Sequence, residues 1–295
     1  MSVEVHPTAV IDPQARLGNG VQVGPYAVIG PHAVLGAGVT IHNHATVTGH
    51  TTLGEGVQVF PGAVLGCVPQ DLKYKGEPTT LEIGAGTIVR ECATLHPGTA
   101  LGGGRTVIGK NCLIMAYAHI AHDCILADQI IVANASQLAG HVHVQEGARI
   151  SGLCAIHHFV TIGRGSFVGG SARLSIDVPP HTLAEGHPAR IRGLNLEGLR
   201  RRGIVGEPVA ALKSAFRLLV RDKGSRAEAY AEIEREGYTQ HPVVAEFVRF
   251  VKRSDAGKNG RALEAERQIV PPSERDGDLS FRPPDGAEMD EDEAE

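Results

Sequence analysis

An aliphatic residue recurs at every sixth position over much of this chain, and this period constrains the fold more than any other feature. The series runs through Ile11, Leu17, Val23, Ile29, Leu35, Ile41, Val47, Leu53, Val59 and Leu65, continues at Ile83, Val89, Leu95 and Leu101, and then shifts by one residue before it runs from Ile108 to Leu174. Because one such repeat cannot bury its own apolar face, only the stacking of neighbouring repeats gives a continuous core.

A period of six predicts a coil of short parallel strands. It contains the strand period of two, so the aliphatic side chains all face one side, while Gly and Asn supply the corners. Three hexapeptides close a triangular turn of about 18 residues, and the turns stack at roughly 4.8 Å. We therefore expect an all-β solenoid, a parallel β-helix, over residues 1–190. The period does not fix its hand, and a left-handed form would be an exception to the right-handed crossover rule.

The repeat is interrupted between Leu65 and Ile83, which lie 18 positions apart. We expect one whole turn of the coil to be replaced here by an external loop over residues 66–80. This stretch lacks the apolar spacing of three and four that an amphipathic helix needs. Loops on a rigid scaffold often carry function, so this one is a candidate part of a site.

Beyond about residue 195 the apolar spacing becomes helical. We expect helices over 208–223, 226–236 and 242–253, which together make a small α-helical C-terminal domain over 191–254. Residues 255–295 are rich in charge, Pro and Gly and end in EMDEDEAE. They predict an acidic, disordered tail without a catalytic role.

Charge and composition exclude several classes of protein. A formal net charge of -5 and a pI near 6.3 leave no basic footprint for nucleic acid. The N-terminus has no basic start followed by an apolar run, and no apolar stretch is long enough to span a membrane, so we expect a cytoplasmic protein. Five cysteines without a CxxC pair argue against a disulfide framework or a zinc knuckle, and we expect them to be small buried groups.

Histidines cluster at positions that an 18-residue turn would stack. The segment AHIAHDC (118–124) contains two histidines and an aspartate on one turn of the coil. Position 140 would stack directly on position 122, one turn along the coil, and two further histidines come about 10 Å away by strand stacking. Four histidines, His119, His122, His141 and His158, line the predicted column, and His157 lies beside His158.

Such a column has three interpretations. A neutral histidine oriented by Asp123 is suited to general-base catalysis near neutral pH, with the amide of Gly140 as an oxyanion donor. A metal site is the second, but a carbonic anhydrase family that shares the hexapeptide coil has two histidine ligands five residues apart, and no two histidines here have that spacing. We expect no metal. The third is a set of surface histidines that pack against a neighbouring subunit.

Six motifs in order resemble one family. They are QDLKYKGEPT (70–79), AHIAHDC (118–124), LAGH (138–141), VGG (168–170), DVPP (177–180) and NLEGLRRRG (195–203). Over roughly residues 3–250 the chain resembles the UDP-N-acetylglucosamine O-acyltransferases that begin lipid A biosynthesis. The resemblance implies a left-handed β-helix, a homotrimer with active sites between neighbouring coils, and an acyl carrier protein as donor, without any cofactor.

The same resemblance implies roles for single residues. His122 matches the general base that deprotonates the sugar 3-hydroxyl, Asp123 its orienting carboxylate, and Gly140 the oxyanion-stabilising amide. The positions that match substrate contacts are Gln70, Asp71, Lys73, His119, His141 and His157, with Asn195, Glu197, Arg201 and Arg202 at nucleotide-binding positions.

Two departures and one docking surface qualify this assignment. His158 stands where the family commonly has Gln, which leaves the 3-amino form of the sugar open as the acceptor, and His187-Pro188 stands where an Asn-His pair is common. In the acyl-chain pocket that the resemblance implies, Gly170 leaves room for a longer acyl chain, while the Phe167 side chain is expected to occupy part of that room. For docking of an acidic carrier protein the candidates are Arg149, Arg164, Arg173 and Arg190.

Two other functions remain open from the sequence. One is a different hexapeptide acyltransferase, either the later N-acyltransferase of the same pathway, which is expected to carry an extra N-terminal domain, or an enzyme that uses acetyl-coenzyme A. The other is a non-catalytic trimeric scaffold. The intact loop, histidine and arginine motifs weigh against the scaffold, which needs none of them.

Overall fold

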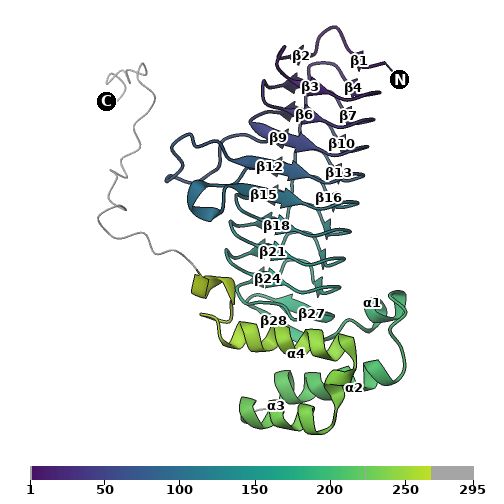
Figure 1. Cartoon of the computed structure of the whole chain (residues 1–295), viewed down its shortest axis with the longest axis vertical. Helices are drawn as coiled ribbons and strands as arrows, with labels where there is room; N and C mark the ends of the chain where they lie inside the picture. Colours follow the sequence, from purple (N-terminus) through teal and green to yellow (C-terminus); the bar gives the residue numbers. More distant parts are fainter. Residues whose placement is uncertain (1, 223, 267–295) are drawn as a thin grey trace, which may run out of the picture.

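The chain winds into a tall triangular coil with helices at one end. The computed structural model describes residues 2–222 and 224–266. Figure 1 shows the coil upright, with the N-terminal turns at the top and the helices at the bottom. The expected architecture is confirmed: a left-handed parallel β-helix is followed by a small helical part.

Three sheets form the faces of the coil, and each turn contributes one strand to each face. Sheet A contains β1 (Glu4–Val5), β4 (Gln22–Val23), β7 (Thr40–Ile41), β10 (Gln58–Val59), β13 (Ile88–Val89), β16 (Leu113–Ile114), β19 (Ile131–Val132), β22 (Arg149–Ile150), β25 (Phe167–Val168), β27 (Thr182–Gly186) and β28 (Ala189–Leu194). Sheet B contains β2 (Val10–Ile11), β5 (Val28–Ile29), β8 (Thr46–Val47), β11 (Val64–Leu65), β14 (Thr94–Leu95), β17 (His119–Ile120), β20 (Gln137–Leu138), β23 (Ala155–Ile156) and β26 (Arg173–Leu174). Sheet C contains β3 (Arg16–Leu17), β6 (Val34–Leu35), β9 (His50–Leu53), β12 (Thr80–Ile83), β15 (Arg105–Ile108), β18 (Ile125–Leu126), β21 (His143–Val144) and β24 (Thr161–Ile162).

The six-residue period builds the core as expected. In regular turns the strand partners are 18 positions apart, as for Ile11 and Ile29. The inward aliphatic side chains stack through the axis of the coil, where Ile29, Leu35 and Ile41 are each at most 2% exposed. Among the strands of the described residues, only β28 reverses direction, pairing antiparallel with β27 at the base.

The first loop (residues 66–79) is an insertion and does not replace a turn. Leu53 pairs with Ile83 and Leu65 with Leu95, each 30 positions apart instead of 18, so the loop adds 12 residues to a turn that is otherwise complete. The expectation of a missing turn was wrong because 12 residues are two full periods, which leaves the phase of the repeat unchanged.

A second loop (residues 96–104) was not expected at all. Ile83 pairs with Ile108 and Leu95 with Ile120, each 25 positions apart, so seven residues are inserted here. The insertion carries the short helix η1 (Ala100–Gly102), in which Leu101 is 50% exposed. Leu101 was therefore wrongly assigned to the buried repeat, because a seven-residue insertion shifts a six-residue phase by only one.

Across the residues that the structure describes, the helical part contains the three expected helices and one further α-helix. These are α2 (Glu207–Phe216), which continues as the π-helix η2 (Arg217–Arg221), α3 (Arg226–Arg235) and α4 (Pro242–Asp255), with η3 (Tyr238–Gln240) before α4. The short α1 (Leu196–Arg201) was not expected. Prolines at the first turns of α2 and α4 suit positions whose N–H has no helical partner. Buried side chains from α2, α3 and α4 form a separate small core around Phe247.

Residues 256–266 differ from the expected disordered tail. Asn259 and Gly260 both have positive φ, 55° and 69°, as a tight two-residue turn requires, and Lys258 and Arg261 exchange both backbone hydrogen bonds across it. The chain then forms η4 (Leu263–Glu266), with Ala262 and Leu263 buried. The rest of the expected tail, 267–295, lies outside the described residues.

Cysteine exposure and helix length bear on two further expectations. Cys112, Cys124 and Cys154 are buried, but Cys67 is half-buried and Cys92 is exposed, so the expectation of burial fails for these two. Across residues 2–222 and 224–266, no helix has the length and apolar character needed to cross a membrane.

Candidate active site

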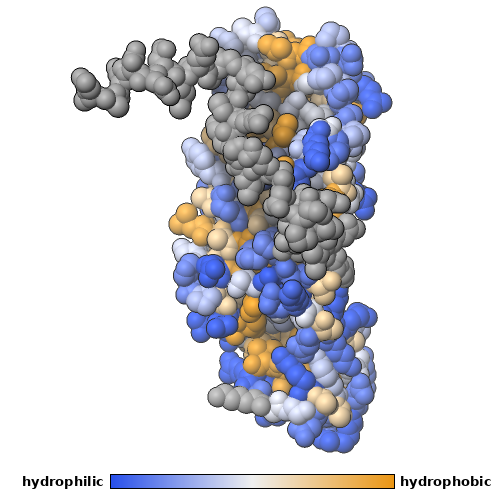
Figure 2. All heavy atoms as spheres, turned by 90° about the vertical axis from the view of Figure 1, so that its left-hand side faces the viewer, coloured by the Kyte–Doolittle hydropathy of each residue, from blue (hydrophilic) through white to orange (hydrophobic). Residues whose placement is uncertain are grey.

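The candidate base His122 and its predicted partners Asp123 and Gly140 lie where the chain passes from sheet B to sheet C, a column of turns that we call the B–C corner. Both loops leave the coil there, because β11 and β14 belong to sheet B while β12 and β15 belong to sheet C. Below the loops, the corner carries the pairs His122–Asp123, Gly140–His141 and His158–Phe159. The loops project to the left in Figure 1, and Figure 2 shows that polar and apolar patches alternate down this side.

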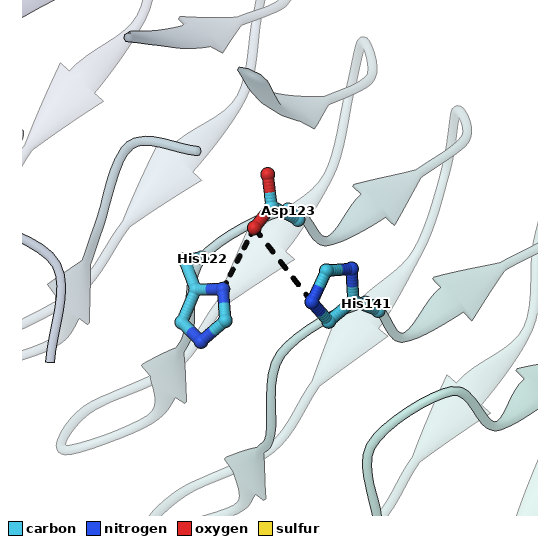
Figure 3. Close-up of side chains that lie close together, drawn as sticks. All are labelled: His122, Asp123 and His141. Carbon is cyan, nitrogen blue, oxygen red and sulfur yellow. Dashed lines mark hydrogen bonds and ion pairs between the residues drawn. The ribbon is translucent and has the colours of Figure 1, made fainter. Parts of the chain in front are cut away.

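The histidine and aspartate of the first pair are hydrogen-bonded to each other. His122 Nδ1 lies 2.7 Å from Asp123 Oδ2, as Figure 3 shows. An ionised carboxylate only accepts, so Nδ1 carries the proton and Nε2 presents a lone pair. The His122 side chain remains partly exposed, at 15%, while that of Asp123 is fully covered. This arrangement gives a base with a fixed tautomer and a free nitrogen.

The second loop holds the Asp123 carboxylate in place. The Thr99 amide donates to Asp123 Oδ1 at 2.9 Å and the Thr99 hydroxyl to Oδ2 at 2.7 Å, while Thr106 Oγ1 accepts from the Asp123 amide. Burial alone would raise the pKa of Asp123, but the hydrogen bonds from His122 and Thr99 outweigh it and leave the pKa below its ordinary value. The carboxylate is thus ionised near neutral pH.

Gly140 lies directly beneath the His122 ring. A Cβ atom at this position would be 2.5 Å from Cε1 and 2.7 Å from Nε2 of His122, so only glycine lets the ring lie so close to the backbone. No acceptor is found for the Gly140 amide among the residues that the structure describes. An 18-residue turn predicted this stacking, and the Cβ distances confirm it.

An aromatic stack continues the column below the pair. Asp123, His141 and Phe159 occupy the same place in three successive turns, with φ near 60° in each. The His141 ring stacks on Phe159 at 4.4 Å and meets the His122 ring edge-on at 5.2 Å. Its Nε2 lies 3.9 Å from Asp123 Oδ2, and burial lowers the pKa of His141, so its ring is predominantly neutral. The stack fixes the lower wall of the site.

The first loop brings a second carboxylate to His122. Asp71 Oδ2 is 4.0 Å from His122 Nε2, on the side of the ring that faces away from Asp123. Asp71 also accepts a hydrogen bond from the Lys73 amide at 3.0 Å, which tightens the loop. The buried His96 ring contacts the carbonyls of Cys67 and Val68 through Nδ1 and so ties the start of the loop to the coil. Gln70 and Lys73 are exposed on this loop.

His119 and His157 lie on the face of sheet B beside the corner. Together with Arg173 and Ser175 they line a cavity of about 320 Å³ whose exposed lining is mainly apolar. The other lining residues are Gln137, Leu138, Ala139, Ala155, Ile156 and Leu174. His119 Nδ1 is 2.8 Å from Thr94 Oγ1, and burial lowers its pKa to about 4, with His96 and His122 adding to the effect. The cavity is therefore apolar and bordered by a neutral imidazole.

The predicted nucleotide-binding residues lie at a different corner. Asn195 caps α1 by accepting from the Gly198 amide and donates to the Gly165 carbonyl. Gly147 and Gly165, against which Arg202 packs, belong to the turns that lead from sheet C to sheet A. Within one chain this group and His122 are thus separated by the width of sheet C.

Ion pairs within α1 engage two more of these residues. Glu197 accepts from Arg200 at 2.9 Å and from Arg201 at 2.7 Å, which lowers the pKa of Glu197 to about 2. All three side chains are at least half exposed.

The predicted acyl-pocket residues are split between two faces. Gly170 lies at the turn that leads into β26, at the start of the sheet B face, and a Cβ there would find ordinary room, 3.6 Å from its nearest neighbour. Phe167 is on sheet A, between Arg149 and Leu183, and does not line the sheet B cavity.

The arginines predicted to dock the carrier protein differ in exposure and in their ion pairs. Arg164 is engaged by Glu146 and by Glu246, the latter at 3.0 Å, which makes it part of the junction with α4. Arg149, Arg173 and Arg190 are exposed.

Three possible metal ligands do converge at the corner. His122, Asp123 and His141 each place one ligand atom within 4.8 Å of the others. However, Asp123 Oδ2 already accepts from His122 and from the Thr99 hydroxyl, so a cation would have to displace both hydrogen bonds. The donor set fits a hydrogen-bonded base better than a metal centre.

Sequence reasoning missed the residues that support the pair. Thr99, Thr106 and Gly102 surround Asp123, and a Cβ on Gly102 would be 2.0 Å from the Asp123 carboxyl carbon. The one signal was the phase shift of the repeat before Ile108, which marks the second loop. What the corner offers chemically is a base, an amide donor and an apolar cavity beside them.

Comparison with known proteins identifies relatives over most of the chain. A family model described as Udp N-acetylglucosamine O-acyltransferase, Domain 2, matches residues 177–259, and a bacterial transferase hexapeptide model matches residues 2–37, 14–49 and 105–140. The chain is 47% identical over 253 residues to the acyl-(acyl-carrier-protein)–UDP-N-acetylglucosamine O-acyltransferase of Thiobacillus denitrificans, covering 86% of this chain and 98% of that protein. The enzyme of the same name from Synechocystis is 46% identical over 205 residues, 69% of this chain and 73% of its own length.

Solved structures agree. A UDP-N-acetylglucosamine acyltransferase from Bacteroides fragilis has a TM-score of 0.81 at 35% identity, covering 84% of this chain and 96% of that one. The corresponding protein from Campylobacter jejuni has a TM-score of 0.79 at 40% identity, with the same coverage.

Proposed function

Since this chain belongs to the family of UDP-N-acetylglucosamine O-acyltransferases, we propose that it moves an acyl chain from acyl carrier protein to the 3-hydroxyl of UDP-N-acetylglucosamine in lipid A biosynthesis. The observation that carries the proposal is the His122–Asp123 pair, with a hydrogen bond of 2.7 Å, directly above the Gly140 backbone. A base and an oxyanion donor beside an apolar cavity are the groups that acyl transfer needs.

In the proposed reaction His122 acts first as base and then as acid. Nε2 takes the proton of the sugar 3-hydroxyl while the oxygen forms a bond to the thioester carbonyl carbon. The Gly140 amide stabilises the resulting oxyanion. As the carbon–sulfur bond breaks, the imidazolium returns its proton to the leaving thiolate. General-base catalysis contributes roughly 10² to 10⁴ in rate and an oxyanion donor about 10² to 10³. As written, the step requires neither a cofactor nor a metal.

Asp123 and the first loop orient the reactants. The ionised Asp123 keeps the proton on Nδ1 and stabilises the imidazolium that forms. Asp71, 4.0 Å from Nε2, is placed to accept a hydrogen bond from a sugar hydroxyl, and Lys73 to contact a phosphate. Gln70, His141 and His157 then border the sugar and the acyl chain.

The complete site requires a second copy of the chain in this proposal. Asn195, Glu197, Arg201 and Arg202 lie at the corner between sheets C and A, whereas His122 lies at the B–C corner. If these residues bind the nucleotide, they reach His122 only from a neighbouring coil. This supports a homotrimer with sites in the clefts between subunits.

A mixing experiment tests the shared site. His122→Ala and Arg201→Ala proteins, each impaired alone, are unfolded together, refolded and assayed, because mixed trimers then contain some clefts with both wild-type residues. We expect activity to rise above that of either variant refolded alone. If light scattering shows that the refolded mixture is trimeric but its activity does not exceed that of either variant refolded alone, the result would contradict an active site built from two chains.

The reaction itself is tested with the purified chain. It is incubated with acyl carrier thioesters of several chain lengths and with UDP-N-acetylglucosamine or its 3-amino analogue, and products are read by mass spectrometry. We expect the 3-O-acyl sugar nucleotide, and loss of turnover in His122→Ala with the trimer intact. Acylation of the 3-amino sugar alone would favour the alternative acceptor that His158 leaves open. If no donor acylates either sugar, the proposed function fails.

A further inference from the structure

The segment 256–266 turns back from α4 and runs along the coil beside the B–C corner. In Figure 1, η4 lies next to β24, on the same side of the coil as the two loops. The match to the family model ends at residue 259, so Arg261 and Glu264 lie beyond it. The resemblance therefore assigns these two residues no role.

A buried aspartate anchors the segment to the coil. Asp177, 5% exposed, accepts hydrogen bonds from the Ala262 amide at 2.9 Å, the Ser254 hydroxyl at 2.8 Å and the Thr161 amide at 2.7 Å. In return, the Asp177 amide donates to the Gly260 carbonyl at 2.8 Å. Because the buried Asp177 carboxylate and amide both hydrogen-bond to the segment, at Ala262 and Gly260, the segment is docked in one orientation.

The anchored segment carries a buried ion pair. Arg261 and Glu264 are 6% and 9% exposed, and Arg261 Nη2 lies 3.1 Å from Glu264 Oε2. Arg261 Nη1 also donates to the Ser175 carbonyl at 2.7 Å. Buried pairs of this kind commonly fix one geometry more than they add stability. Here the fixed group is the Glu264 carboxylate.

That carboxylate faces the lower end of the histidine column. Glu264 Oε2 lies 3.9 Å from His158 Nε2, in the range of an ion pair. The His158 ring contacts His157 at 3.8 Å and Phe159 edge-on at 5.4 Å, and Phe159 stacks on His141. Side-chain contacts through His158, Phe159 and His141 therefore connect Glu264 continuously with the B–C corner.

The segment also touches the wall of the apolar cavity. Ser175, whose carbonyl Arg261 holds, and His157, which packs on His158, both line the cavity of about 320 Å³ on sheet B. The exposed lining of the cavity is mainly apolar, which suits a hydrocarbon chain. One ion pair thus supports two points on the rim of the same cavity.

We propose that Glu264, held by Arg261, is a positioning residue for the acyl donor and acts through His158. The carboxylate orients the His158 imidazole, which packs on His157, and His157 and Ser175 form part of the rim at which the acyl chain enters the cavity. The inference rests on the proposed function for the identity of the donor, an acyl carrier thioester. It concerns binding of the donor and not the proton transfers at His122.

The test compares Glu264→Gln with His158→Gln in the full chain. The amide side chain introduced by Glu264→Gln can still accept from Arg261 but has no charge to orient the ring. We expect either substitution to raise the KM for the acyl carrier thioester about tenfold. In Glu264→Gln, kcat and the KM for the UDP-sugar should stay within about twofold of wild type. In the His158→Gln background, Glu264→Gln should add less than about twofold, because a residue that acts through His158 loses its effect when His158 is absent.

A matched control separates positioning from docking. Ser254→Ala removes one hydrogen bond to Asp177 but leaves Arg261, Glu264 and His158 in place, and it should leave the donor KM unchanged. Glu264→Asp, which keeps the charge, should recover part of the loss.

Calorimetric titration with the acyl carrier thioester gives the same comparison without turnover. It therefore distinguishes a failed positioning role from a failed reaction. Additive effects of the two substitutions would overturn the inference. A wild-type donor affinity in His158→Gln would overturn it even if Glu264→Gln did not fold.

Discussion

Gly140 offers a direct test of how closely the position of the His122 ring controls the reaction. In Gly140→Ala the new Cβ would lie 2.5 Å from His122 Cε1 and 2.7 Å from Nε2, whereas ordinary contacts begin near 3.4 Å. The ring must therefore move by about 1 Å, and a misplacement of that size costs on the order of 10²-fold in rate. A 10²-fold loss corresponds to about 2.7 kcal/mol of transition-state stabilisation.

The backbone should tolerate the same change. The φ of Gly140 is not in the positive range that favours glycine, and the substituted residue keeps its amide. We therefore expect kcat/KM to fall about 10²-fold while the melting temperature changes by only a few degrees.

Initial rates with saturating acyl carrier thioester, together with circular dichroism melts, measure both effects. Gly152→Ala is the matched control: its φ is likewise not positive, it lies at the corner between sheets A and B, and its Cβ would meet only one carbonyl oxygen, at 3.2 Å. Wild-type kcat/KM in Gly140→Ala, or an equal loss in Gly152→Ala, would refute the argument from ring position.

The surroundings of His122 support three more predictions. Thr99→Val removes one charge-assisted hydrogen bond from Asp123, so kcat should fall about tenfold. In Thr99→Ser, which keeps the hydroxyl, kcat should stay near the wild-type value. Equal kcat values in the two variants would show that the hydroxyl does not orient Asp123. Burial lowers the pKa of His119 to about 4, so the unfolded state binds more protons than the folded state between about pH 6.5 and 4. The free energy of unfolding in urea should therefore fall as the pH is lowered through that window, and it should fall less in His119→Gln. The same pH dependence in both proteins would contradict this assignment. Incubation with EDTA should leave activity unchanged, because Asp123 Oδ2, the oxygen near both histidines, already accepts two hydrogen bonds. A loss that zinc restores would instead point to a metal at His122, Asp123 and His141.

The repeat predicted the coil because burial in a solenoid depends on period alone. Ile29 or Ile120 needs only to point inward once per turn, and a spacing of six guarantees this. For the same reason, the six-residue period did not reveal the two inserted loops. Twelve inserted residues kept the phase, and seven shifted it by one, so Leu101 looked like a core residue although it is half exposed.

The site was predictable where it follows the register of the turns and unpredictable where it depends on the loops. Gly140 stacks under His122 because the two are one regular turn apart. Thr99 reaches Asp123 from 24 positions away through an irregular segment, and no pattern in the sequence encodes that contact. The Arg261–Glu264 pair likewise depends on the path of the chain after α4. Tertiary contacts determine that path, and helix propensity does not predict it.

The burial of successive turns also implies where this molecule comes apart first. Ile11 and Leu17, in the earliest turns, are only partly buried, whereas Ile29 and Leu35 are almost fully enclosed and the last turns are covered by β28 and α4. In a one-dimensional stack each layer is held only by its neighbours, so opening should progress as a fraying front from the N-terminal layers. Amide exchange would then slow layer by layer along the axis, and the turns that carry His122 and His141, enclosed from above and below, would be among the last to open.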